Sequence, residues 1–128
     1  MVYKGAKMSI CIVDDSVVVR KVIKKALQLH HYLDFIEAEN GKIALEKIKT
    51  QFSKIELYIL DVNMPEMDGI TLVGEIRKLS QNTPIIMLTT ETDKTKMLKA
   101  KELGATGWVV KPFDADKFIK VVDILLGK

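Results

Sequence analysis

The sequence predicts an α/β fold: a five-stranded parallel sheet flanked by five helices that cover both of its faces. Short apolar segments alternate five times with segments of helical periodicity along the 128 residues. The runs at 57–60 and 85–88 are continuously apolar, as expected of strands buried on both faces of a parallel sheet. Each crossover between such strands should be right-handed. Periodicity alone leaves the strand order open.

The first half of the chain contains two of the expected strand–helix pairs. Residues 8–13 form an apolar strand, and Ser16 is suited to cap the helix that follows. That helix ends at His30 and His31, which point in different directions and therefore indicate a solvated helix end rather than a metal site. The remaining elements of this half are an edge strand over 33–38, a turn at Asn40-Gly41 and a short helix over 43–48.

The second half repeats the alternation three times. Pro65 and Asp68-Gly69 indicate an irregular loop after the central strand. Caps and stops then mark the helices: Asp68-Gly69 opens one that reaches Leu79, Asp93 caps one that ends before Gly104, and Asp114 caps the last one. The strands between them are expected over 85–88 and 108–110.

Composition places the chain among soluble globular proteins. Hydrophobic residues make up 48% and charged residues 29%, and the net charge of +3 demands no DNA partner. The single cysteine, Cys11, lies in an apolar run and is expected in the core, which is compatible with a reducing compartment. No apolar run is long enough for membrane insertion, and the start lacks the apolar stretch of a signal peptide. We expect one cytoplasmic, monomeric domain over residues 1–128, with its core at about 8–127.

Polar side chains follow four of the five expected strands directly. Asp14 and Asp15 follow the first strand, Asp61 the third, Thr89 the fourth and Lys111 the fifth. In a parallel sheet these strand ends share one edge, where open α/β sheets bind their ligands. Three carboxylates would repel one another there unless a cation is present. Few carboxylates on an exposed edge favour Mg²⁺ over a complete Ca²⁺ cage.

The same groups could hold a phosphoryl group on Asp61. A carboxylate can act as a nucleophile, while Mg²⁺ and Lys111 neutralise oxygen charge and Thr89 donates a hydrogen bond. Taken singly, Asp61 could be a helix cap and Lys111 a surface lysine. The set is more specific because its members stand at the ends of four of the five expected strands.

Four motifs resemble those of two-component response-regulator receiver domains, most closely the stand-alone chemotaxis regulators. They are VDDS at 13–16, LDVNMPEMDG at 60–69, LTT at 88–90 and VVKPF at 109–113. The resemblance runs from about residue 8 to the end and implies a flavodoxin-like fold with strand order 2-1-3-4-5. It also implies a phosphoacceptor signalling protein, rather than an enzyme, that catalyses its own phosphorylation and dephosphorylation.

The resemblance assigns roles to the metal and phosphoryl site. Asp61 would take a phosphoryl group from a phosphohistidine on a sensor kinase. Asp15 and Asp61 would ligate Mg²⁺ directly, the main-chain carbonyl of Asn63 would complete the protein ligands, and Asp14 would act partly through water. Asn63 and Glu91 match the two variable positions that tune self-dephosphorylation.

The resemblance also assigns a switch. Thr89 would move toward the phosphoryl group and Lys111 would pair with it, with a cis bond between Lys111 and Pro112. Trp108 matches an aromatic switch position usually held by Tyr or Phe, and its size could alter the switch. The alternative is a partly buried Trp that packs beside the last two helices.

Partners follow from the same resemblance. In the family, the face of the fourth helix, fifth strand and fifth helix docks target proteins. Here the fourth helix carries four lysines, Lys94, Lys96, Lys99 and Lys101. We therefore expect an acidic or amphipathic peptide to bind there. A chemotaxis regulator would have a CheA-type histidine kinase and the flagellar motor switch protein FliM as partners. Because the chain ends soon after Leu126, we expect output through another protein.

The sequence is also compatible with other functions. A receiver of this kind could serve another phosphorelay, or act as a scaffold that is never phosphorylated. An Mg²⁺-dependent phosphatase using Asp61 would need a second carboxylate two residues on, where Asn63 stands. A flavin-binding domain of the same sheet order would need a Ser-, Thr- and Gly-rich loop after the first strand, where Asp14 and Asp15 would repel the flavin phosphate.

Overall fold

A computed structural model describes residues 8–90 and 94–128. Its strands form one parallel sheet in the order β2-β1-β3-β4-β5, which confirms the order implied by the resemblance. The strands are β1 (Ser9–Val13), β2 (Phe35–Ala38), β3 (Ile55–Asp61), β4 (Ile85–Thr89) and β5 (Gly107–Val110). The helices are α1 (Val17–Gln28), α2 (Gly41–Gln51), α3 (Gly69–Leu79), α4 (Lys94–Leu103) and α5 (Ala115–Leu125), with a 3₁₀ turn, η1, at Phe52–Lys54.

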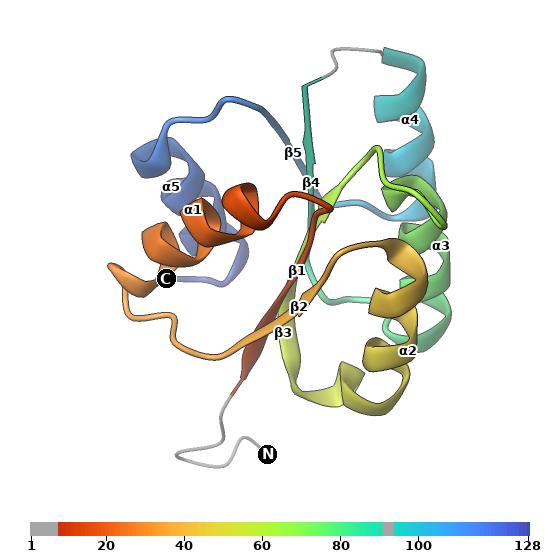
Figure 1. Cartoon of the computed structure of the whole chain (residues 1–128), viewed down its shortest axis with the longest axis horizontal. Helices are drawn as coiled ribbons and strands as arrows, with labels where there is room; N and C mark the ends of the chain where they lie inside the picture. Colours follow the sequence, from red (N-terminus) through yellow and green to blue (C-terminus); the bar gives the residue numbers. More distant parts are fainter. Residues whose placement is uncertain (1–7, 91–93) are drawn as a thin grey trace.

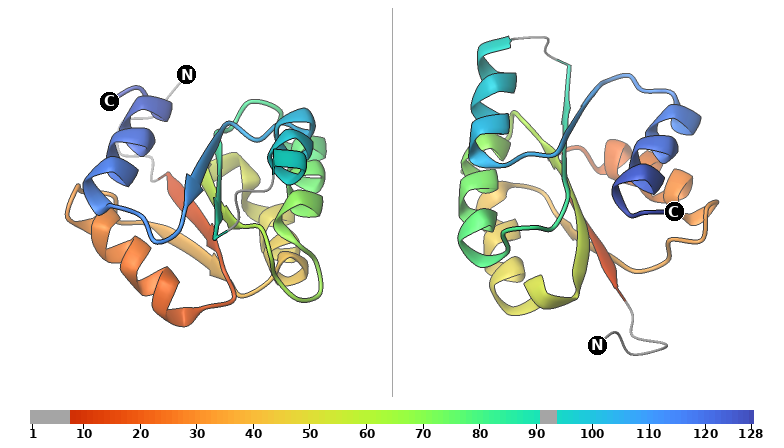
Figure 2. Two further views of the ribbon diagram at one scale, coloured as in Figure 1. Left: turned by 90° about the horizontal axis from the view of Figure 1, so that it is seen from above. Right: turned by 180° about the vertical axis from the view of Figure 1, so that it is seen from behind.

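The sheet lies between two layers of helices. Helices α1 and α5 cover one face, and α2, α3 and α4 cover the other (Figures 1 and 2). Neighbouring residues of a strand serve opposite faces: Ile59 belongs to the core under α1 and α5, whereas Tyr58 belongs to the core under α2, α3 and α4. Strands β1 and β4 are buried along their whole length, and β3 is buried from Leu57 to Asp61, so the apolar runs at 57–60 and 85–88 lie in the core, as the sequence predicted.

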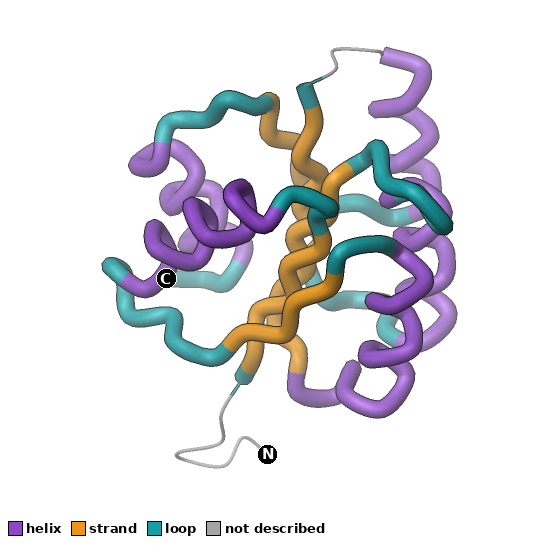
Figure 3. Tube along the Cα trace, viewed as in Figure 1, coloured by secondary structure: helices purple, strands orange, loops and turns teal. Residues whose placement is uncertain are grey.

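The carboxyl ends of the strands gather at one edge of the sheet, at the top of Figures 1 and 3. Val13 pairs in register with Leu60, and Asp61 pairs with Leu88. Thr89 pairs with Val110 at the end of β5. The residues that follow these positions therefore share the same edge, as expected.

Side-chain caps begin the helices whose starts the structure describes. The side chains of Ser16, Asp68 and Asp114 each accept a hydrogen bond from an amide three residues on. The turn predicted at Asn40-Gly41 is wrong, because Asn40 caps α2 and Gly41 is its first residue. Asn40 Oδ1 accepts from the Ile43 amide at 2.8 Å. The cap expected at Asp93 lies outside the described residues.

The helix ends also agree with the sequence. Helix α1 ends at Gln28, and His30 and His31 lie exposed just beyond it. Gly104 ends α4 with a φ of +115°, a conformation that favours glycine. Cys11 is buried in the core. In the described ranges, every helix is too short or too polar to cross a bilayer.

Candidate functional site

Three carboxylates converge at the carboxyl edge of the sheet. One oxygen from each of Asp14, Asp15 and Asp61 lies within 4.8 Å of the others. Asp14 is 1% exposed and Asp61 is 6% exposed, whereas Asp15 faces solvent. Asp61 is the last residue of β3, so a buried strand holds it in place. The structure thus brings together the carboxylates that the sequence predicted.

Lys111 joins this group from the end of β5. Its Nζ lies 3.1 Å from Asp14 Oδ2 and 3.4 Å from Asp61 Oδ1. Burial alone would lower the pKa of Lys111, but the hydrogen bond and charge of Asp14, followed by those of Asp61, raise it above its usual value. The peptide bond between Lys111 and Pro112 is cis, as the resemblance implied.

The electrostatics of the group fit a divalent cation. Burial, and then the charge of Asp14, raise the pKa of Asp61 to about 6, although Lys111 acts in the opposite direction. One ammonium therefore balances only part of the negative charge. The donors are carboxylate oxygens with one side open to solvent, which suits a hard ion such as Mg²⁺ that keeps several waters.

The remaining predicted residues border the same edge. Thr89 is 1% exposed at the end of β4, and its carbonyl accepts from the Lys111 amide at 2.7 Å. Asn63 lies exposed in the β3–α3 loop, with its Oδ1 3.4 Å from Lys96 Nζ on α4. Glu91, predicted to tune dephosphorylation, lies outside the described residues.

The loop between β1 and α1 carries contacts that the sequence reading missed. The Asp14 amide donates to the Ala38 carbonyl at 3.2 Å, and Asp14 Oδ1 accepts from the Ser16 amide at 2.9 Å. Arg20 Nη1 donates to the Asp14 carbonyl, and Arg20 Nε lies 3.3 Å from Glu37 Oε1 on β2. The sequence contained one signal for a role of Arg20: it is a basic residue near the start of a helix, where the helix dipole disfavours positive charge.

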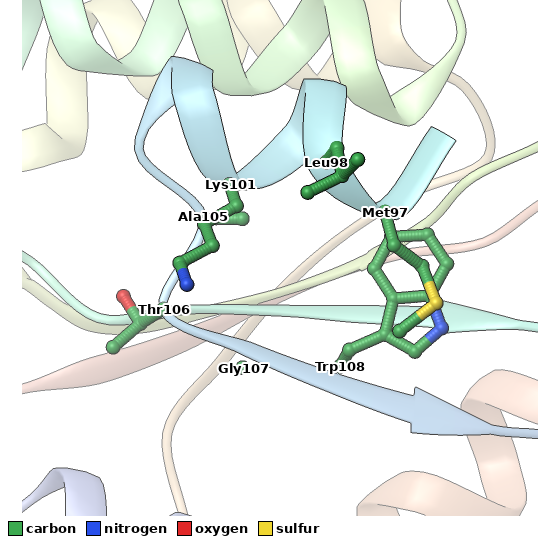
Figure 4. A pocket seen from close by; sticks show the side chains of 7 residues that line it. All are labelled: Met97, Leu98, Lys101, Ala105, Thr106, Gly107 and Trp108. Carbon is green, nitrogen blue, oxygen red and sulfur yellow. The ribbon is translucent and has the colours of Figure 1, made fainter. Parts of the chain in front are cut away.

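Trp108 lies on the α4 side of the sheet. It pairs in register with Met87, whose side chain belongs to the core under α2, α3 and α4. Figure 4 shows its ring beside Met97 of α4. The neighbouring Gly107 faces α5, so the alternative placement beside the last two helices is wrong in part: the indole packs on α4 alone of the two. Within the described ranges the buried indole nitrogen has no hydrogen-bond partner.

A hollow opens beside this ring, between α4 and β5. Met97, Leu98 and Lys101 line it from the helix, and Trp108 lines it from the strand (Figure 4). Lys94, Lys99 and Lys101 are exposed, and Lys96 is half-buried. Of the four lysines that the sequence analysis placed on this helix, Lys101 lines the hollow itself.

The fold and this site define a class of protein, and comparison with known proteins identifies it. The family model of the response regulator receiver domain matches residues 10–123. Such a match covers most of the chain, and the chain therefore belongs to the response-regulator receiver family.

Several relatives within the family are named as chemotaxis proteins. The chain is 38% identical to chemotaxis protein CheY1 of Helicobacter pylori over 122 residues, covering 94% of this chain and 98% of that protein. It resembles the structure of CheY4 from Vibrio cholerae with a TM-score of 0.85 and 38% identity, over 94% of this chain and 100% of the other. It resembles CheY in a CheX–CheY–BeF₃–Mg²⁺ complex from Borrelia burgdorferi with a TM-score of 0.90 and 29% identity, over 97% and 92% of the two chains.

Proposed function

We propose that this protein is a chemotaxis response regulator that Asp61 switches by accepting a phosphoryl group. The observation that carries the proposal is the convergence of Asp14, Asp15 and Asp61 with Lys111 at one edge of the sheet. The similarity to CheY proteins along nearly their whole length supports the chemotaxis assignment. A solved relative contains BeF₃ and Mg²⁺, the pair of ligands expected for such a site.

The phosphoryl donor would be a phosphohistidine on a CheA-type kinase. An oxygen of the ionised Asp61 carboxylate would attack phosphorus, and the P–N bond would break with its electron pair left on nitrogen. Because the other ring nitrogen of the phosphohistidine carries a proton, the products are an aspartyl phosphate and a neutral imidazole. Bound Mg²⁺, held by Asp15, Asp61 and the carbonyl of Asn63, would neutralise charge on the phosphoryl oxygens. Hydrolysis of the aspartyl phosphate by water would reset the protein.

Two side chains would read the new phosphoryl group. The ammonium of Lys111 already lies 3.4 Å from Asp61 Oδ1, so it can pair with a phosphoryl oxygen after a small displacement. The hydroxyl of Thr89, at the end of the adjacent strand, would donate to a second oxygen. Thr89 and Trp108 lie on the paired strands β4 and β5. Movement of Thr89 would then change the space available to the Trp108 ring.

The output surface would be the face formed by α4, β5 and α5. The hollow beside Trp108 offers apolar contacts, and the lysines of α4 offer positive charge, which together suit an amphipathic acidic segment. We propose the flagellar motor switch protein FliM as the target. A target in another phosphorelay would use the same chemistry and differ only in this contact.

Intact mass measurement tests the phosphoryl chemistry. The protein is incubated with acetyl phosphate, with and without Mg²⁺, and compared with Asp61→Asn and with Glu66→Gln, an exposed acidic residue of the neighbouring loop. We expect an adduct of one phosphoryl group on the wild type and on Glu66→Gln, only with Mg²⁺. An adduct on Asp61→Asn at the same level would contradict the assignment.

Rapid hydrolysis could hide the adduct, so beryllofluoride provides a second measurement. It mimics a phosphoryl group without turning over, and Trp108 is the only tryptophan in the chain. We expect an Mg²⁺-dependent fluorescence change that saturates with beryllofluoride and is absent in Asp61→Asn. Silence in both measurements would favour the scaffold that is never phosphorylated.

A further inference from the structure

We propose that Arg20 is a positioning residue of the metal site, which it serves by fixing the peptide bond between Asp14 and Asp15. This inference rests on the proposed Mg²⁺ site and adds a residue that does not touch the metal. The three carboxylates differ in what holds them in place. Asp14 and Asp61 both pair with Lys111, but in the part of the chain that the structure describes, the Asp15 carboxylate accepts no hydrogen bond.

The orientation of Asp15 must therefore come from its backbone. The carbonyl of Asp14 belongs to the peptide group that joins it to Asp15, and this group is planar. Arg20 Nη1 donates to that carbonyl. The Asp14 amide, which donates to the Ala38 carbonyl at 3.2 Å, belongs to the preceding peptide group, so the two contacts together hold the peptide planes on both sides of the Asp14 Cα.

Arg20 is itself held from a second side. Its Nε lies 3.3 Å from Glu37 Oε1, and Lys24 Nζ lies 2.9 Å from Glu37 Oε2. Burial would raise the pKa of Glu37, but its bonds to Lys24 and Arg20 lower it, so the carboxylate stays charged. The Arg20 side chain is only 14% exposed, which leaves it little freedom to leave this position.

The fork of the guanidinium suits this role. It offers Nε to Glu37 on β2 and Nη1 to the carbonyl of the β1–α1 loop at the same time, in a fixed plane. A lysine ammonium is a point donor on a flexible stem and cannot impose the same plane. The cost is a positive charge near the start of α1, where the helix dipole disfavours it.

Charge and positioning predict opposite effects on Mg²⁺ binding, so the experiment can separate them. A cation close to a cation site opposes binding, and removing it should tighten Mg²⁺ binding if charge is all that Arg20 supplies. If Arg20 positions Asp15, removing it should weaken binding, since supporting contacts around a metal are typically worth 10- to 100-fold in affinity.

The test is an NMR titration of the full chain with MgCl₂, which reports the dissociation constant of the folded protein alone. We expect Arg20→Ala to weaken Mg²⁺ binding by about 10-fold or more. Arg20→Lys, which keeps the charge, should restore only part of the affinity. Glu37→Gln should act in the same direction more weakly and serves if the Arg20 variants do not fold. Lys21→Ala, exposed on the same helix, removes the same charge and should leave affinity unchanged or slightly higher.

Wild-type affinity or tighter binding in Arg20→Ala, or full wild-type affinity in Arg20→Lys, overturns the positioning role. Weaker binding in both Arg20 variants but not in Lys21→Ala supports it. Failure of the wild type to bind Mg²⁺ would instead refute the proposed metal site itself. The two failures are therefore distinguishable in one titration series.

Discussion

Gly69 lies directly against the carbonyl group of Asp61. A Cβ built on Gly69 would come within 2.0 Å of the Asp61 oxygen. The Gly69 amide also donates to the Val62 carbonyl at 2.9 Å. The start of α3 is therefore pressed onto the end of β3, and only glycine leaves room for this approach.

Gly69→Ala should destabilise the fold, because the new methyl group meets backbone rather than a side chain that can move aside. We expect the free energy of unfolding to fall by about 1–3 kcal/mol, measured by urea denaturation. Gly74→Ala in the same helix is the matched control, since its nearest atom lies 3.9 Å away. That variant should gain about 0.5–1 kcal/mol from helix propensity. Equal stability of the two variants would contradict the close approach.

Lys111→Ala should change how the protein responds to Mg²⁺. Without the ammonium, Asp14 and Asp61 repel each other more strongly, and we expect the free energy of unfolding at neutral pH in EDTA to fall by about 2–3 kcal/mol. A divalent cation can then replace the lost charge, so MgCl₂ should raise the Tm of this variant more than that of the wild type. Lys120→Ala, exposed on α5, is the control. An equal or smaller rise in Tm would show that Lys111 does not oppose the cation.

Asp61→Asn should stabilise the protein in the absence of metal. The pKa of Asp61 is raised from 3.8 to about 6 by burial and by Asp14, so between these values the folded state holds a proton that the unfolded state has lost. Its contribution to stability therefore falls as pH rises through this window and stays unfavourable above it. At pH 7.5 in EDTA we expect the variant to gain up to about 3 kcal/mol. The gain should disappear below about pH 4.

Thermal unfolding at several pH values measures this dependence. Glu66→Gln removes an exposed carboxylate from the neighbouring loop and should show no comparable gain. A gain for Asp61→Asn that does not decrease toward acid pH would mean that ionisation of Asp61 is not its cause.

Reversal of charge on α4 should weaken target binding. Lys94→Glu with Lys96→Glu replaces two positive charges by two negative ones on α4, the helix that lines the hollow at Trp108. With beryllofluoride-activated protein and FliM from the same genome, we expect at least a 10-fold rise in Kd at low salt and a smaller rise at high salt. Lys21→Glu with Lys25→Glu on α1 makes the same change of charge away from this face. Similar affinities for the two double variants would exclude a local role for the α4 lysines.

The strands and their common edge could be predicted from the sequence, because a strand buried on both faces has a local sequence pattern: a continuous apolar run that ends in a polar residue. The face of the sheet on which Trp108 lies could not be predicted from the sequence, because that face depends on the register between β4 and β5. Arg20 and Glu37 are 17 positions apart, and only the pairing of β1 with β2 brings them together.

Asn40-Gly41 shows a different limit. Asn followed by Gly is a strong turn signal, because the Asn side chain can hydrogen-bond to the nearby backbone. The side-chain oxygen of an Asn that caps a helix also accepts a hydrogen bond from a backbone amide, so the two cases resemble each other in sequence. A contact far along the chain decides between the two. The Gly41 amide donates to the Met67 carbonyl at 3.2 Å, and a Cβ on Gly41 would come within 2.5 Å of that oxygen.

Helix α4 is anchored less firmly than its neighbours. Of its described residues only Ala100 is buried, whereas α1 and α5 bury three residues each and α3 buries four. Opening of such a helix exposes little apolar area to water, so its amide protons should exchange with solvent through local openings that leave the sheet intact. A modest free energy from a bound phosphoryl group is then enough to redistribute its conformations. Among the described helices, the one that contributes the surface proposed to receive the target is therefore the one that costs least to rearrange.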